Sequence, residues 1–132
     1  KYETFVDLTG DRSNEDWPTP KTQYSLSATY VAPTPAGDLT STVTWSGRSK
    51  QNLSPASKNE SQVTQKAYGL LNARVSLDVA DQDLTISLFG RNLTDEVYSV
   101  SAVGLESMGW NIAATGEPRT WGIDLVKRFG GE

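Results

Sequence analysis

The feature that most constrains the fold is a repeated two-residue alternation of apolar and polar side chains. It runs through residues 24–30 (YSLSATY) and returns at 39–46, 71–79 and 84–90. A period of two places successive side chains on opposite faces of a β-strand, whereas a helix would mix the two sets. The alternation therefore predicts an all-β chain whose strands each have one apolar and one polar face.

Turn-forming residues separate these strands in pairs. The segments 33–38 (PTPAGD) and 80–83 (ADQD) are short and rich in Pro, Gly and Asp, so each is expected to close an antiparallel hairpin. A last strand is predicted over 119–129, and a weaker one is expected to open the chain from Tyr2 to Leu8. Together these segments predict an antiparallel up-and-down meander of about six strands.

The connections alternate between long and short. Segments 10–21, 50–66 and 92–116 are long and fall at one end of the predicted sheet, and the short turns fall at the other. This is the plan of an outer-membrane β-barrel, which turns its short connections to the periplasm. The polar segment 50–66 is expected to be a poorly fixed surface loop. Periodicity alone also allows a soluble β-sandwich, in which each alternating strand has one buried face.

Composition removes several function classes. The chain has 12 Lys and Arg against 16 Asp and Glu, a net charge of −4, and neither Cys nor His. An acidic chain without a basic stripe is not expected to bind nucleic acid. Without Cys or His, a disulfide framework, the usual zinc sites and a Ser-His or Cys-His catalytic pair are excluded. Neither a cofactor nor a metal is expected.

Acidic pairs in the sequence do not indicate an enzyme. Asp95 and Glu96 have no His partner, so they are expected to cap and pair locally rather than act in acid-base catalysis. Asp81 and Asp83 lack the additional oxygen ligands of a calcium loop and are expected to form a hairpin turn. We therefore expect that the protein is not an enzyme.

Two motifs near the C-terminus carry a resemblance to a known family. They are GRNLTDEVY at 90–98 and GEPRTWGI at 116–123, the second followed by a strand that ends in Phe129. Together they resemble the C-terminal end of a TonB-dependent outer-membrane receptor. In that family an Asn-Leu-Thr-Asp-Glu element and a Tyr follow the penultimate strand, and Gly-x-Pro-Arg-Thr opens the last strand. The matching residues are Asn92, Leu93, Thr94, Asp95, Glu96, Tyr98, Gly116, Pro118, Arg119 and Phe129.

The resemblance implies that residues 1–132 are the C-terminal segment of a larger transmembrane barrel of about 22 strands, without the plug domain or the remaining strands. It implies a location in the bacterial outer membrane, with lipid, the rest of the barrel and the plug as partners. TonB would be engaged through an absent N-terminal part. The implied function is uptake of a small-molecule nutrient, most often an iron-siderophore complex. The isolated segment is expected to be oligomeric because its sheet edges are unpaired.

Candidate ligand contacts come from the outer loops and from the polar face. They are Trp110, Asn111, Tyr98, Arg74 and Arg91. Trp110 could stack on a ligand, although packing within its own loop explains it as well. The polar face carries five charged residues: Arg74, Asp78, Arg91, Asp124 and Arg128. In a barrel these side chains would point toward the lumen and the plug. The alternative is that they are solvated surface charges.

The apolar face carries five large aromatic residues: Tyr24, Tyr30, Trp45, Trp121 and Phe129. In a barrel some of them would form the aromatic girdles at the membrane interfaces. The alternative is the core of a soluble β-sandwich, a carbohydrate- or ligand-binding module that would use Trp110 and Tyr98.

Overall fold

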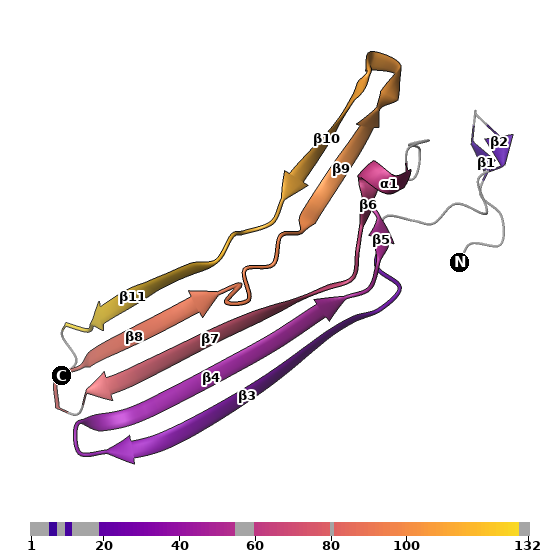
Figure 1. The fold of residues 1–132 in the computed structure, drawn as a ribbon. Helices are drawn as coiled ribbons and strands as arrows, with labels where there is room; N and C mark the ends of the chain where they lie inside the picture. The colour runs from indigo at the N-terminus through magenta and orange to yellow at the C-terminus, as the bar shows by residue number, and fades with distance from the viewer. Residues whose placement is uncertain (1–5, 8–9, 12–18, 55–59, 80, 130–132) are drawn as a thin grey trace.

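The computed structural model describes residues 6–7, 10–11, 19–54, 60–79 and 81–129. In these ranges the main element is a five-stranded antiparallel sheet with the strand order β11-β8-β7-β4-β3. Each strand lies beside its predecessor in this series, as the predicted meander requires (Figure 1). The strands are β3 (Gln23–Thr34), β4 (Gly37–Arg48), β7 (Tyr68–Val79), β8 (Leu84–Arg91) and β11 (Thr120–Lys127).

The register of the sheet is continuous, so the alternating patterns of the separate strands add up to two uniform faces. Leu26 pairs with Trp45, and Trp45 pairs with Leu71, which brings apolar side chains together on one face. By the same pairing, Thr44 lies beside Asn72 on the other face. The predicted division into an apolar and a polar face is confirmed, with Phe89 of the strand 84–91 as an apolar residue on the polar face.

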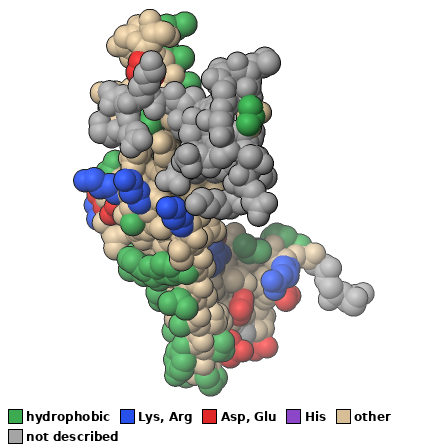
Figure 2. All heavy atoms as spheres, turned by 90° about the vertical axis from the view of Figure 1, so that its right-hand side faces the viewer, with side chains coloured by type: hydrophobic (Ala, Val, Ile, Leu, Met, Phe, Trp, Pro, Cys, Tyr) green, Lys and Arg blue, Asp and Glu red, His purple; other side chains and the backbone are tan. Residues whose placement is uncertain are grey.

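The apolar face is open to the surroundings. Leu26, Leu125 and Trp121 are 68%, 69% and 74% exposed, and no second sheet covers them among the described residues. Figure 2 shows hydrophobic side chains gathered along the lower left side of the molecule. A soluble β-sandwich would bury this face against another layer. The β-sandwich alternative is therefore wrong for the described part of the chain.

The short connections lie at one end of the sheet. Pro35 and Ala36 link β3 to β4, and residues 80–83 link β7 to β8. Asp81 and Asp83 have positive φ angles of 62° and 47°, a conformation that Asp tolerates in tight turns, which confirms the predicted hairpin turn. The long connections emerge at the opposite end (Figure 1). We refer to the latter as the outer end of the sheet.

The segment 50–66 contains local structure that its composition did not predict. Its described residues form β5 (Gln51–Asn52), α1 (Glu60–Val63) and β6 (Thr64–Gln65), with β5 and β6 paired, and residues 55–59 lie outside the described ranges. Val63 is 1% exposed. The order arises from burial of Val63 and from backbone pairing, neither of which a polar, turn-rich composition reveals.

The segment 92–116 also contains structure that was not predicted. It forms the hairpin of β9 (Ser99–Leu105) and β10 (Trp110–Thr115), joined by the short 3-10 helix η1 (Glu106–Met108). Gly109 closes the helix in a left-handed conformation at φ 83°. The hairpin continues beyond the outer end of the sheet (Figure 1). Among the described residues, no helix is long and apolar enough to cross a membrane.

The two ends of the chain depart from the predicted strands. The described part of the expected strand 2–8 is β1 (Val6–Asp7), and it pairs with β2 (Gly10–Asp11) rather than with the main sheet. Its remaining residues lie outside the described ranges. At the other end β11 stops at Lys127, so Phe129 follows the strand and is 85% exposed. Within the described ranges the main sheet therefore has five strands.

Candidate functional site

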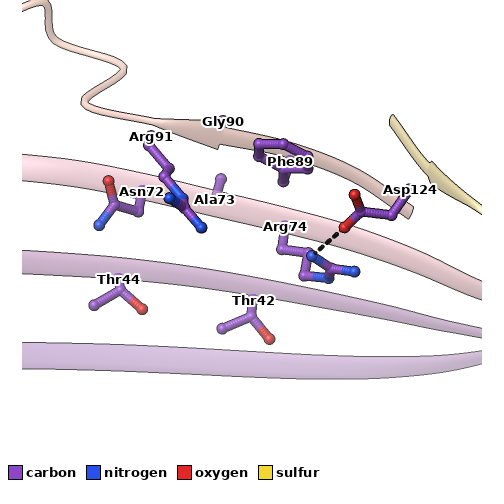
Figure 3. A pocket seen from close by; sticks show the side chains of 9 residues that line it. All are labelled: Thr42, Thr44, Asn72, Ala73, Arg74, Phe89, Gly90, Arg91 and Asp124. Atoms are coloured by element: carbon purple, nitrogen blue, oxygen red, sulfur yellow. Dashed lines mark ion pairs between the residues drawn. The ribbon is translucent and has the colours of Figure 1, made fainter. Parts of the chain in front are cut away.

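The polar face contains an open recess of about 320 Å³ near the middle of the sheet. Its walls come from four of the five strands and carry two arginines, one aspartate and several neutral polar groups (Figure 3). The lining residues are Thr42, Thr44, Asn72, Ala73, Arg74, Phe89, Gly90, Arg91 and Asp124. Strand alternation builds the recess, because every second residue of neighbouring strands points to the same side.

Arg74 is held against the wall of the recess. Its Nη1 lies 2.9 Å from Oδ2 of Asp124, an ion pair that reaches from β7 past β8 to β11. Its Nε donates a hydrogen bond to Oγ of Ser76 at 3.3 Å. The side chains of Arg74 and Asp124 remain 47% and 41% exposed, so the pair contributes little to stability and leaves the charges accessible to a partner.

Arg91 is held less firmly. Its guanidinium lies 5.8 Å from the centre of the Phe89 ring, and its Nη1 is 3.7 Å from Oε2 of Glu117. The arginine side chain is 61% exposed. A guanidinium group held over an aromatic ring keeps a defined orientation, and its N–H groups remain available as hydrogen-bond donors. The recess thus presents one arginine paired to the wall and a second whose donors remain accessible.

The structure brings Arg74 and Arg91 into one site and places the other three candidate ligand contacts elsewhere. The ring of Tyr98 stacks on Tyr68 with a centroid distance of 4.6 Å and covers Gly116, where a Cβ atom would lie 2.0 Å from the ring. Gly116 N also donates to Tyr98 O at 2.8 Å. The structural role of Tyr98 is thus to close the base of the outer hairpin.

Trp110 and Asn111 lie near the far end of the β9–β10 hairpin. Trp110 pairs with Leu105 and is 49% exposed. The amide of Asn111 accepts a hydrogen bond from Leu105 N at 2.9 Å and donates one to Gln62 Oε1. Trp110 is the more accessible of the two, and their role as ligand contacts stays a prediction.

Asn92 of the family motif forms the junction between β8 and the outer connection. It is 3% exposed and has a positive φ of 47°. Its Oδ1 accepts from Glu96 N at 2.9 Å, and its Nδ2 donates to Glu96 O and Glu117 O at 2.8 and 3.0 Å. Its backbone N donates to Oδ1 of Asn72 in β7. One side chain thus joins the start of the outer connection to the segment that leads into β11.

Other motif residues reinforce the junction. Leu93 packs over Gly90, where a Cβ atom would lie 2.5 Å from Leu93 Cδ2. Asp95 N donates to Asn92 O at 2.9 Å, and the Asp95 carboxylate pairs with Arg119 at 3.2 Å. The carboxylate of Asp95 thus pairs with a residue 24 positions away, directly before β11, rather than with a sequence neighbour.

Recess residues that the sequence did not single out are Thr42, Thr44, Asn72 and Phe89. They were missed because only the register places them beside the two arginines. The alternation could have indicated them, because along each strand every second residue lies on the same face, and these residues lie on the face of Arg74 and Arg91.

A single antiparallel sheet with one exposed apolar face, one polar face and its long connections at one end is the wall of an outer-membrane β-barrel. Comparison of the sequence agrees: residues 2–93 match the family described as TonB dependent receptor-like, beta-barrel. The chain belongs to this family. Its members are receptors of the outer membrane of Gram-negative bacteria, and the family is not one of enzymes.

The fold is also similar to a solved structure, the ferric yersiniabactin uptake receptor FyuA from Yersinia pestis. The TM-score is 0.68 at 20% sequence identity, and the match covers 80% of this chain and 16% of the receptor. The matched region therefore spans about a sixth of that receptor. A comparison with curated proteins gave no match.

Proposed function

We propose that this chain forms part of the wall and outer loops of an active transporter that takes up a scarce nutrient with energy from TonB. An iron-siderophore complex is the first candidate for the nutrient. The observation that carries the proposal is the two-faced single sheet, whose apolar side suits lipid and whose polar side suits a lumen. Membership of the receptor family supports TonB as the energy source.

The named ligand of the similar receptor supports the proposal that the nutrient is a ferric complex. The protein from Yersinia pestis takes up ferric yersiniabactin. In the proposed transporter the polar face contacts the plug domain of the same receptor, and Arg74 and Arg91 supply charge-assisted hydrogen bonds to the plug or to the passing ligand. TonB engages a part of the receptor other than these strands.

The test uses the intact receptor that contains this sequence, expressed in a strain in which its own gene is deleted. Cells are given radiolabelled ferric complexes under iron limitation, and iron uptake is measured with and without TonB and with a protonophore. We expect uptake of at least one complex that requires the receptor, TonB and the proton-motive force. Uptake that persists without TonB would overturn the transport mechanism. TonB-dependent uptake of a nutrient without iron would correct only the choice of ligand.

A substitution of Trp110 tests whether the outer loops contact the ligand, as the same proposal requires. Because it is half exposed near the far end of the β9–β10 hairpin, Trp110→Ala is expected to raise the ligand concentration for half-maximal uptake severalfold. The maximal rate is expected to stay unchanged, since the hairpin lies outside the sheet. Trp121→Ala is the matched control, because Trp121 belongs to the apolar face. Equal effects of the two variants would remove Trp110 from the ligand contacts.

A further inference from the structure

The polar face of the sheet is not uniform, because hydroxyl groups and charges occupy different strands. Residues 25–31 of β3 and 40–46 of β4 include no charged side chain. Every second residue of these two segments lies on the polar face, and all of them except Val31 carry a hydroxyl group. We call these hydroxyl residues the hydroxyl lane: Ser25, Ser27, Thr29, Thr40, Thr42, Thr44 and Ser46.

Hydroxyl groups of the lane are bonded to one another across the two strands. Oγ of Ser27 and Oγ1 of Thr44 share a hydrogen bond at 3.1 Å. One row further inward, Oγ1 of Thr29 and Oγ1 of Thr42 share another at 3.1 Å. These hydroxyl groups therefore have partners within the wall itself and do not need a covering surface to supply their hydrogen bonds.

The other three strands of the face carry charges. Arg74 of β7 pairs with Asp124 at 2.9 Å, past β8 and on the side of β7 away from β4 (Figure 3). Arg91 of β8 lies 3.7 Å from the carboxylate of Glu117. These four side chains are between 41% and 67% exposed, so they remain accessible to a partner on the polar side. We call them the charged side.

A plug that covers the whole polar face would be held unequally by these two regions. Hydrogen bonds to ionised groups are roughly twice as strong as those between neutral groups. Separation from the charged side also removes a partner from each charge, whereas the paired hydroxyl groups of the lane keep theirs. The plug should therefore separate first from the hydroxyl lane.

The hydroxyl lane also suits the passage of a polar solute. Seven residues of extended strand span about 20 Å, which is much of the roughly 25 Å depth of a barrel wall. Hydroxyl groups both donate and accept hydrogen bonds, and without a formal charge they do not retain an ionic solute. Rapid passage requires such weak binding at several successive positions.

We propose that the hydroxyl lane is the side of the wall from which the plug separates, so that the nutrient passes along β3 and β4. The charged side on β7, β8 and β11 keeps the plug attached during this step. This inference rests on the proposed function, since it assigns the path within that transporter.

The test measures thiol labelling at two positions of equal depth in the intact receptor. Ser27→Cys reports on the hydroxyl lane, and Thr120→Cys is the matched control on β11. Both positions are exposed and lie in one row across the sheet. In this row Ser27 pairs with Thr44, Thr44 with Asn72, and Thr120 with Arg91, which follows Gly90 in the β7–β8 register. The 132 residues contain no native Cys, and any elsewhere in the receptor is replaced by Ser.

Labelling by a small polar maleimide is followed by mass spectrometry in detergent micelles, without nutrient or TonB. Each rate is divided by the rate of the same variant unfolded in urea, so that the ratio reports local opening. We expect Ser27→Cys to be labelled about tenfold faster than Thr120→Cys. Equal ratios, or faster labelling of Thr120→Cys, would overturn the proposal.

Two further substitutions test the cause of the difference. Arg74→Gln with Asp124→Asn removes the ion pair at constant net charge and is expected to speed labelling of Thr120→Cys severalfold. Thr29→Val removes a hydroxyl group of the lane and should leave labelling of Ser27→Cys unchanged. If loss of the ion pair has no effect on Thr120→Cys, the charged side does not hold the plug and the proposal is wrong.

The path itself is tested with a bulky side chain in the uptake assay with radiolabelled ferric complexes. Ser27→Trp is expected to lower the maximal uptake rate severalfold, and Thr120→Trp, at the same depth, to lower it much less. Equal losses would contradict passage along the lane.

Failure of this inference is distinguishable from failure of the proposed function. Equal labelling at the two positions in a receptor with TonB-dependent uptake overturns this inference alone. Faster labelling of Ser27→Cys in a receptor whose uptake persists without TonB overturns the proposed mechanism and leaves the weaker attachment at the hydroxyl lane in place.

Discussion

Asn92 lies directly after β8, where the main sheet ends and the outer connection begins. Its side chain makes three hydrogen bonds, and its positive φ is a conformation that Asn adopts more readily than Ala. In Asn92→Ala the part-buried backbone groups of Glu96 and Glu117 lose three hydrogen bonds, so we expect a loss of about 3 kcal/mol in the free energy of unfolding. The measurement is urea unfolding of the receptor in detergent micelles, followed by Trp fluorescence.

Asn92→Gly is the matched control for the backbone conformation. Glycine adopts a positive φ without strain, so this variant loses only the hydrogen bonds. We expect Asn92→Ala to be less stable than Asn92→Gly by about 1 kcal/mol, the strain of a left-handed alanine. Wild-type stability in both variants would mean that the hydrogen bonds to Glu96 and Glu117 do not hold the junction.

Tyr24 and Gly47 form a close contact between neighbouring strands on the apolar face. A Cβ atom on Gly47 would lie 2.4 Å from Tyr24 Cζ, and the Tyr24 hydroxyl accepts a hydrogen bond from Trp45 Nε1 at 3.2 Å. Gly47→Ala must therefore displace the ring, at a cost of about 1–3 kcal/mol in stability.

The double-mutant cycle with Tyr24→Ala isolates this contact. Once the ring is gone the added methyl group no longer collides with it, so the cost of Gly47→Ala is expected to fall to about 0.5 kcal/mol or less. The readout is again the free energy of unfolding in micelles. An identical cost with and without the ring would place the strain of Gly47→Ala elsewhere.

At the scale of elements, Gln65 joins the two outer connections. Its Oε1 accepts from Ser99 N at 2.6 Å, which ties β6 to the first residue of β9. Gln65→Ala is expected to speed hydrogen exchange at the Ser99 amide by about tenfold, the effect of losing about 1.4 kcal/mol of local protection. Exchange within β7 and β8 should stay unchanged. Gln23→Ala, at an exposed position in β3, is the matched control; if it has the same effect, Gln65 is not the link.

The elements that the sequence predicted are those whose stability depends on one repeated pattern. Strands β3, β4, β7, β8 and β11 alternate because each has one apolar and one polar face along its length. The β9–β10 hairpin and the β5–β6 pair were missed because contacts between distant segments hold them. These two connections meet at two buried residues, Ala102 (8% exposed) and Val63 (1% exposed). The sequence of either segment alone does not indicate this contact.

The candidate site was predicted only as far as the alternation of single strands allows. Alternation placed Arg74, Arg91 and Asp124 on the polar face. It did not reveal that Arg74 reaches Asp124, because that pair requires the strand order β11-β8-β7 and its register. Tyr98 looked available for a ligand because its stacking partner, Tyr68, is 30 residues away in the sequence.

For the whole molecule, the open sheet has consequences when the 132-residue chain is isolated. Within the described chain β3 and β11 each pair on one side only, and the apolar face exposes large side chains such as Tyr30, Ile123 and Leu125. Unpaired strand edges and large apolar patches both promote association in water. The chain by itself is therefore expected to be oligomeric in plain buffer and dispersed in detergent.

Size-exclusion chromatography with light scattering, run with and without detergent, measures this directly, and far-UV circular dichroism on each peak reports the strand content. A pair of lysines on the apolar face, Leu26→Lys with Leu125→Lys, should weaken the association, because burial of either charge between two sheets is unfavourable. Thr42→Lys on the polar face is the matched control and should leave it unchanged. A β-rich monomer of the unaltered chain in plain buffer would contradict the prediction, because the apolar face would then have to be covered within a single chain.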